Sequence, residues 1–269
     1  MSFVQVSPRE RDLPPNPENA TRYPRAPAKT AFRECSESST RSVRLGPVTA
    51  QPTSTLSYGK FDVQGIRVRT EPMLRIHGYP EPDHASPRIR EAAERMAACA
   101  ERLFRLDLAY RPVTIRRCDG RTLTLETDTT LNCGDSGCSL TDCTTVVAFF
   151  LTAGEELDKE GARLQSDGNL LDALFLETAG WLGIEAATKS FAAYLRGWGQ
   201  AHGYALRSRL APGCGTWPLA DQKPLLSLFD GLPVPVRLLE SCAMTPKMSR
   251  SGLYGLRLRQ ATKPPSQPG

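Results

Sequence analysis

The sequence of 269 residues contains no apolar run long enough to cross a membrane as a helix, which takes about 20 residues. Its most apolar stretch, residues 170–187, is interrupted by Asp172, Glu177 and Glu185. The N-terminus reads MSFVQVSPRERDLPPN and lacks the apolar core of a secretory signal. We therefore expect a cytoplasmic protein without a membrane span, whose eight cysteines are mostly reduced thiols.

Two common signatures of enzymatic sites are also missing. No Gly-x-Gly-x-x-Gly motif follows a predicted strand, which disfavours a Rossmann-type methyltransferase. The chain has only three histidines, and His77 and His84 share a Pro-rich loop with Asp83 but with no third ligand in view. We predict that both histidines are surface residues and that they bind no metal.

The cysteines leave one alternative open. Cys133, Cys138 and Cys143 follow one another with four residues between them, and Cys118 is close in sequence. Structural zinc is usually held by more closely spaced pairs, and the common iron–sulfur patterns differ as well. We interpret these cysteines as buried thiols and loop residues. A cysteine-based metal protein is the alternative, and it predicts stoichiometric zinc or iron in the purified chain.

The net charge of +5 is unevenly distributed. Residues 1–60 hold nine Lys/Arg and five Asp/Glu, so the rest of the chain is nearly neutral, which argues against a nucleic-acid-binding surface. Residues 1–57 also hold eight of the 22 prolines and few aromatic residues. Such a composition buries too little apolar surface to offset the entropy of ordering. We predict a disordered tail over 1–57, one folded domain over 58–260 and a second disordered tail over 261–269.

The remaining pattern predicts an α+β fold with a mainly antiparallel, twisted sheet packed with helices. Asp119-Gly120 separates two alternating stretches, which is typical of a β-hairpin, and 144–152 is the best candidate for a central buried strand. Ser86-Pro87 is typical of a helix start. The other expected strands are 61–63, 66–68, 74–76, 205–210, 235–239 and 254–258, and the other expected helices are 154–164, 169–200 (with a break near Gly180 or Gly183) and 219–229.

Two late segments carry the most specific pattern. The first reads RLAPGCGTWPLADQK and begins with Arg209, and the second reads ESCAMTPKMSRSG and begins with Glu240. An arginine offers a planar fork of donors for a carboxylate, and glycines allow a backbone to come close to a ligand. A helix and a strand are expected between the two segments. Together they predict a pocket for a small zwitterion.

These segments resemble the S-adenosylmethionine-binding activation domain of cobalamin-dependent methionine synthase. That family has Arg-x-x-x-Gly-Tyr and a nearby Pro, followed by Glu-Ser-x-x-Met-x-Pro-x-x-Ser-x-Ser-Gly. The stretch 146–154, with Glu156 and Asp158 after it, is similar to short, free-standing members. The matching residues are Arg209, Gly213, Pro218, Glu240, Ser241, Met244, Pro246, Ser249, Ser251 and Gly252.

The resemblance implies a function as an accessory module. The domain binds S-adenosylmethionine beside cobalamin carried by another protein, and supports reductive methylation of inactive cob(II)alamin with an electron from a flavodoxin-type reductant. The expected partner is a cobalamin-binding methionine synthase, or another corrinoid methyltransferase or demethylase. A non-catalytic module that binds S-adenosylmethionine or a corrinoid protein is a further alternative. Whether the chain counts as an enzyme is therefore left open, and no catalytic side chain is expected.

The resemblance also implies roles for particular residues. Arg209 would bind the ligand carboxylate, Ala211, Gly213 and Cys214 would line the nucleoside, and Glu185 would accept the ligand ammonium. Glu240, Ser249 and Ser251 would form the opposite wall, and the residues facing the corrinoid would be Cys214, Trp217 and Met244. Cys214 stands where the family has its tyrosine, and the favoured interpretation is a tolerated replacement with Trp217 filling part of the space.

Overall fold

The computed structural model describes residues 56–259. The two predicted tails fall outside these residues, apart from positions 56 and 57, so the expected domain limits stay a prediction. In the part of the chain that the structure describes, no helix combines the length and the apolar character that a bilayer crossing requires.

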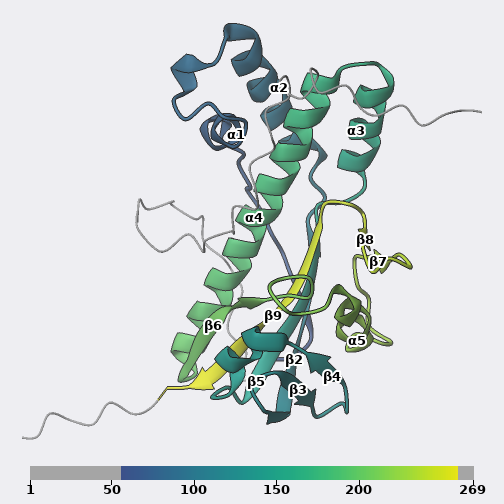
Figure 1. The fold of residues 1–269 in the computed structure, drawn as a ribbon. Coiled ribbons are helices and arrows are strands. Elements are labelled where there is room, and N and C mark those ends of the chain that lie inside the picture. Colours follow the sequence, from purple (N-terminus) through teal and green to yellow (C-terminus); the bar gives the residue numbers. More distant parts are fainter. Residues whose placement is uncertain (1–55, 260–269) are drawn as a thin grey trace, which may run out of the picture. The chain divides into compact units, whose positions relative to one another are not determined.

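An antiparallel sheet of seven strands forms the centre of the fold (Figure 1). Six strands follow one another in the order β4-β3-β2-β5-β9-β6, and β1 pairs with β2. A separate two-stranded sheet joins β7 and β8. The bounds are β1 Gly59–Phe61, β2 Asp107–Cys118, β3 Thr122–Leu125, β4 Thr130–Asn132, β5 Thr145–Thr152, β6 Tyr204–Leu210, β7 Arg237–Leu238, β8 Met244–Thr245 and β9 Ser249–Leu258.

β5 is the buried central strand that the sequence predicts. Its β-branched and aromatic residues suit a pleated surface that is covered on both sides. Val147, Phe149 and Leu151 point into one apolar core, whereas Val146 and Phe150 point into another. This alternation has the period of two that a strand imposes on its side chains.

The predicted β2–β3 hairpin is also confirmed. The carboxylate of Asp119 accepts hydrogen bonds from the backbone N–H groups of Arg121 and Thr122, at 2.9 and 2.7 Å. Gly120 has a φ of 92°, a conformation that favours glycine. The Asp-Gly pair therefore forms the turn through the side-chain hydrogen bonds of Asp119 and the positive φ of Gly120, the properties that make this pair a hairpin signal in a sequence.

Helices cover both faces of the sheet (Figure 1). The long helix α4 lies along one face and α5 lies on the other side, and their apolar residues belong to the two different cores. The helices are α1 Thr70–Ile76, α2 Pro87–Leu103, α3 Glu156–Ser166, α4 Leu170–Ala201 and α5 Gln222–Ser227, with 3₁₀ turns η2 Pro82–His84, η3 Gly134–Leu140 and η4 Leu219–Asp221.

Two local predictions are wrong. Residues 74–76 belong to helix α1, and the segment 66–68 is not a strand. A stretch of three alternating residues carries too little periodicity to decide, and α1 gains its burial by tertiary packing. Its Met73 and Leu74 are buried, and the ring of His77 just beyond it packs edge-on against Phe175 of α4.

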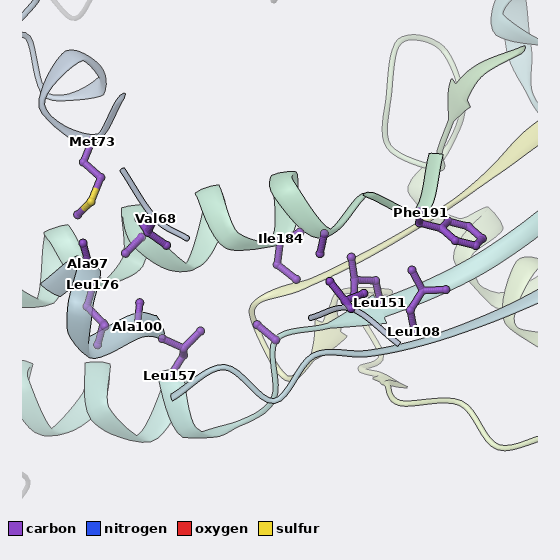
Figure 2. Close-up of a cluster of buried hydrophobic side chains, with 14 of the residues drawn as sticks. Val68, Met73, Ala97, Ala100, Leu108, Leu151, Leu157, Leu176, Ile184 and Phe191 are labelled. Carbon is purple, nitrogen blue, oxygen red and sulfur yellow. The ribbon is translucent and has the colours of Figure 1, made fainter. Parts of the chain in front are cut away.

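The expected break in α4 does not occur, because its glycines serve close packing. A Cβ atom at Gly183 would lie 2.2 Å from the ring of Phe104, and one at Gly180 would lie 3.1 Å from Met248. The helix therefore remains continuous while it approaches its neighbours. Figure 2 shows the core that α4 forms with α1, α2, α3 and the sheet, including Met73, Leu108, Leu151, Leu157, Leu176, Ile184 and Phe191.

Replacing Gly183 by Ala should therefore destabilise the protein by about 1–3 kcal/mol, since the added methyl group forces the Phe104 ring to move. Gly197→Ala in the same helix is the matched control. No atom lies within 4 Å of its added Cβ, so it should be neutral or gain about 0.5–1 kcal/mol from helix propensity. Urea unfolding of both variants measures the difference, and equal effects would contradict the packing role of Gly183.

Candidate functional site

The candidate site is centred on Arg209, near the end of β6. The strand pairs antiparallel with β9, and Arg209 lies opposite Tyr254. The guanidinium crosses to β9 and donates from Nη1 to the backbone oxygen of Ser251 at 2.9 Å. The structure thus brings together the two late segments that the sequence singled out.

Gly252 makes this approach sterically feasible. Its φ is 151°, and a Cβ atom there would lie 2.4 Å from the carbonyl oxygen of Leu210 and 3.3 Å from Nη1 of Arg209. Any other residue would push β6 away or displace the guanidinium. The match of this glycine to the family pattern therefore has a steric basis at this position.

The charge of Arg209 has no direct counter-ion. Within residues 56–259 no carboxylate oxygen lies within 4.0 Å of it. Burial lowers the pKa of Arg209, and the nearby guanidinium of Arg250 lowers it further. A partly buried cation with no counter-ion among these residues is unfavourable, so this position is suited to an anionic ligand group.

Glu185 of α4 lies at the same site but already has partners. Its carboxylate pairs with Nη1 of Arg250, and Lys189 lies 3.5 Å from it one helical turn away. Arg250 also donates to the hydroxyl of Thr188 at 3.3 Å. Burial raises the pKa of Glu185, but hydrogen bonding and attraction from Arg250 and Lys189 outweigh it and lower the pKa overall.

The loop after β6 is a compact double turn. The backbone N–H of Gly213 donates to the oxygen of Trp217 at 2.9 Å, and the N–H of Cys214 donates to that of Ala211 at 3.2 Å. Both amides are therefore used inside the loop rather than offered to a ligand. Gly213 and Gly215 have φ values of 85° and 59°, and the side chain of Cys214 is exposed.

This loop is supported by contacts that the sequence did not predict. The hydroxyl of Thr216 accepts a hydrogen bond from the backbone N–H of Asp135 at 2.8 Å. A Cβ atom at Gly134 would lie 2.2 Å from that hydroxyl, so the η3 segment fits closely against the loop. Ser251 and Gln222, each 3% exposed, share a hydrogen bond of 2.9 Å that ties α5 to β9. No local sequence signal marks such long-range pairs.

The second expected wall is only partly present. Ser249 lies in β9, and its hydroxyl donates to the oxygen of Pro246 at 2.6 Å and lies 2.9 Å from that of Thr152. Its side chain therefore holds the start of the strand. Glu240 lies on the exposed turn between β7 and β8, where no described contact joins it to Arg209.

The expected role of Trp217 needs a correction. Its side chain is only 2% exposed and belongs to the core on the α5 side, where its Nε1 donates to Asp221 at 2.8 Å. A buried indole offers no surface to a corrinoid on another protein. Met244 is partly buried against the same core, so Cys214 is the one fully exposed member of that expected set.

The cysteines gather around η3 and its neighbours. The thiol of Cys118 lies 3.6 Å from the oxygen of Gly137, and that of Cys138 lies 3.4 Å from the oxygen of Gly120. Among residues 56–259, no group of three or more His, Cys, Asp and Glu side chains is placed to hold a metal ion. The described cysteines are all free thiols.

Two hollows lie on other parts of the surface. One of about 280 Å³ is bordered by Ile66, Arg67 and Glu101, and one of about 420 Å³ lies beside His202 and Tyr204. Neither is lined by Arg209, Arg250 or Glu185.

Comparison with known proteins supports the fold assignment. No family model matches this sequence, and neither does any curated protein. Thirteen chains of solved structures match. One is the MetH reactivation domain bound to AdoHcy, with a TM-score of 0.56 and 17% identity over 77% of this chain and 81% of that chain. The predicted fold, an antiparallel sheet packed with helices like that of the methionine synthase activation domain, is thereby confirmed.

The Glu185–Arg250 pair predicts a pH dependence. Because the pKa of Glu185 is lowered in the folded protein, the pair stabilises the fold at pH values above the ordinary range of a glutamate, and this contribution is lost as the pH falls through the lowered value. The unfolding free energies of the native chain and of Glu185→Gln should therefore differ at pH 7 and converge as the pH falls below the lowered pKa of Glu185. A constant difference across this range, measured by urea unfolding, would contradict the ion pair.

The thiols should differ in reactivity. Burial raises the pKa of Cys133 to about 12 and that of Cys143 to about 11, which suppresses the reactive thiolate at pH 8. The exposed Cys138 and Cys214 should react first with a disulfide reagent, and mass spectrometry identifies the labelled sites. A Cys35→Ser background removes a thiol outside the described residues. Early labelling of Cys133 in the folded chain would contradict this order, and unfolded protein is the positive control.

Proposed function

We propose that this chain binds S-adenosylmethionine at Arg209 and supports the reductive methylation of cob(II)alamin on a separate cobalamin-dependent methionine synthase. The observation that carries the proposal is the partly buried guanidinium of Arg209, which reaches β9 but has no carboxylate beside it among residues 56–259. A ligand carboxylate would supply the missing counter-ion. The fold similarity to a reactivation domain that binds AdoHcy supports this class of ligand.

The surrounding residues fit the amino-acid end of such a ligand. Arg209 would bind the carboxylate through a charge-assisted hydrogen bond. Glu185, on the facing helix, would bind the ammonium group, although in the structure its carboxylate pairs with Arg250 and Lys189. The loop 211–214 would border the nucleoside with its backbone and with the exposed side chain of Cys214. Ser249 and Ser251 would support the site indirectly, because their hydroxyls hold β9 in place.

The chemistry asks little of the chain beyond positioning. The methyl group of the ligand would pass from its sulfonium to the partner's corrinoid once a flavodoxin-type protein had supplied the electron, and S-adenosylhomocysteine would be left behind. No side chain of this protein has to gain or lose a proton in that step. Its contribution is to hold the ligand so that its methyl group is presented to the partner, which lowers the entropic part of the barrier. We place this activity in the cytoplasm.

Two alternatives share the same site. The partner could be another corrinoid methyltransferase or a corrinoid demethylase, since the ligand chemistry is the same. A non-catalytic binding module is the other alternative. It is favoured by the exposed Cys214, which stands at the position of the family's tyrosine. Binding without any methyl transfer would favour the binding module.

Arg209→Met should weaken S-adenosylmethionine binding about tenfold to a hundredfold, which is the usual cost of losing a hydrogen bond between charged groups. Titration calorimetry measures the affinity. The methylation rate is followed by the absorbance of methylcobalamin, with a cob(II)alamin-loaded methionine synthase that lacks its own activation domain and with a reductant. The methylation rate of the variant should be lower than that of the native chain as well.

Arg207→Met is the matched control. Arg207 lies two positions earlier on the same strand, but its guanidinium pairs with Asp142 at the surface, so its loss should leave binding unchanged. No binding by the native chain, or equal affinities for Arg209→Met and the native chain, would overturn the proposal.

A further inference from the structure

The candidate site contains a second arginine that the family pattern does not assign. Arg250 lies between Ser249 and Ser251 of β9, at a position that the pattern leaves open. Its side chain is 15% exposed and contacts Glu185 and Thr188 of α4. It therefore lies on the α4 side of the sheet, near Arg209.

Among the residues that the structure describes, the two guanidinium groups have one carboxylate between them, that of Glu185. Arg250 lowers the pKa of Arg209 by repulsion, and Glu185, which pairs with Arg250, acts on Arg209 in the opposite direction. Lys189 adds a further positive charge at 3.5 Å from the carboxylate of Glu185. Lys189 is largely exposed, but Arg209 and Arg250 are not, so the described part of the site carries an excess of partly buried positive charge, which favours the entry of an anionic group.

Gly252 lets β6 and the side chain of Arg209 lie close to this part of β9. It lies between Arg250 and Tyr254 along β9, and side chains two positions apart in a strand point to the same face. A Cβ atom there would lie 2.4 Å from the oxygen of Leu210 and 3.3 Å from Nη1 of Arg209, so a glycine is needed for Arg209 to approach the strand that carries Arg250. A small carboxylate is the kind of group that two arginines on adjacent strands can share.

We propose that Arg250 is a second carboxylate-binding residue, and that the Arg250–Glu185 ion pair opens to admit the zwitterionic amino-acid end of the ligand. The carboxylate binds to Arg209 and Arg250, and the ammonium binds to the carboxylate of Glu185, which Arg250 has released. This inference rests on the proposed function, because it concerns the same ligand.

The exchange preserves the charge pairing of the site. Before binding, Arg250 and Glu185 satisfy each other, and after binding each has a partner of opposite charge on the ligand. A ligand that carries only the ammonium would compete with Arg250 for Glu185 and leave both arginines without an anion. Breaking one side of a poorly exposed ion pair is costly, so such a ligand should be rejected. Arg250 is therefore a specificity-determining residue that favours ligands with an intact amino-acid group.

The test compares three probes by titration calorimetry: S-adenosylhomocysteine, its decarboxylated analogue, and 5′-methylthioadenosine, which lacks both charged groups. The native chain should bind S-adenosylhomocysteine about tenfold to a hundredfold more tightly than the decarboxylated analogue. Arg250→Leu should reduce this ratio severalfold while it leaves the affinity for 5′-methylthioadenosine unchanged. Arg250→Lys, which keeps the charge but not the fork, should give an intermediate ratio.

The matched control is Arg257→Leu on the same strand, since Arg257 pairs with Asp142 and should not affect the ratio. Circular dichroism checks that each variant folds. If Arg250→Leu does not fold, the comparison of the affinity ratio between Arg250→Lys and the native chain serves as the test. If the native chain binds none of the probes, the proposed function fails with this inference. If it binds S-adenosylhomocysteine but discriminates no more than Arg250→Leu or Arg250→Lys does, only the role of Arg250 is overturned.

Discussion

The pairing of β9 with β5 on one side and β6 on the other is the constraint on which the rest of the structure depends. β5 gives β9 a fully buried neighbour, and its aromatic residues anchor the two cores. β6 brings Arg209 to the other edge of β9, where Gly252 permits the approach. β9 therefore belongs both to the core of the sheet and to the candidate ligand site. The hydrogen-bond ladder of the sheet sets the geometry of that site.

The electrostatics of the site follow from this placement. Arg209 and Arg250 come from adjacent strands and are both held at low exposure, so their repulsion is poorly screened by water. One carboxylate, on a helix that is rigidly packed across the sheet, cannot neutralise both. The fold thus keeps the two positive charges close together. On a flexible surface the same side chains could move apart. An arrangement of this kind is unfavourable for stability and favourable for binding an anion.

Much of the fold could be predicted because its main elements have strong local patterns. β5 is a continuous apolar run, the β2–β3 turn contains Asp119-Gly120, and α2 begins at Ser86-Pro87. The helix α1 was missed because its burial depends on packing against α2 and α4 rather than on its own three-residue pattern. The candidate site was indicated in the sequence by Arg209 and the glycine-containing segments, and the structure brings Arg209 and Ser251 together, whereas the binding roles stay a prediction. The supporting pairs Thr216–Asp135 and Ser251–Gln222 could not be found this way, since each joins residues far apart in the chain. The burial of Trp217 was missed for the same reason.

The alternation along β9 limits how this part of the chain can change. Ser251 reaches Gln222 beneath the sheet, whereas its neighbour Arg250 reaches the helix above it. Inserting or deleting a single residue between Ser251 and Leu253 would exchange these two directions. It would place a guanidinium against the α5 core and a hydroxyl against α4. The turn at Glu240–Ala243 lies at the surface outside this ladder and is free of that restriction. A change of length within residues 249–253 would therefore disturb the contact with Gln222 and the contact with α4 at the same time.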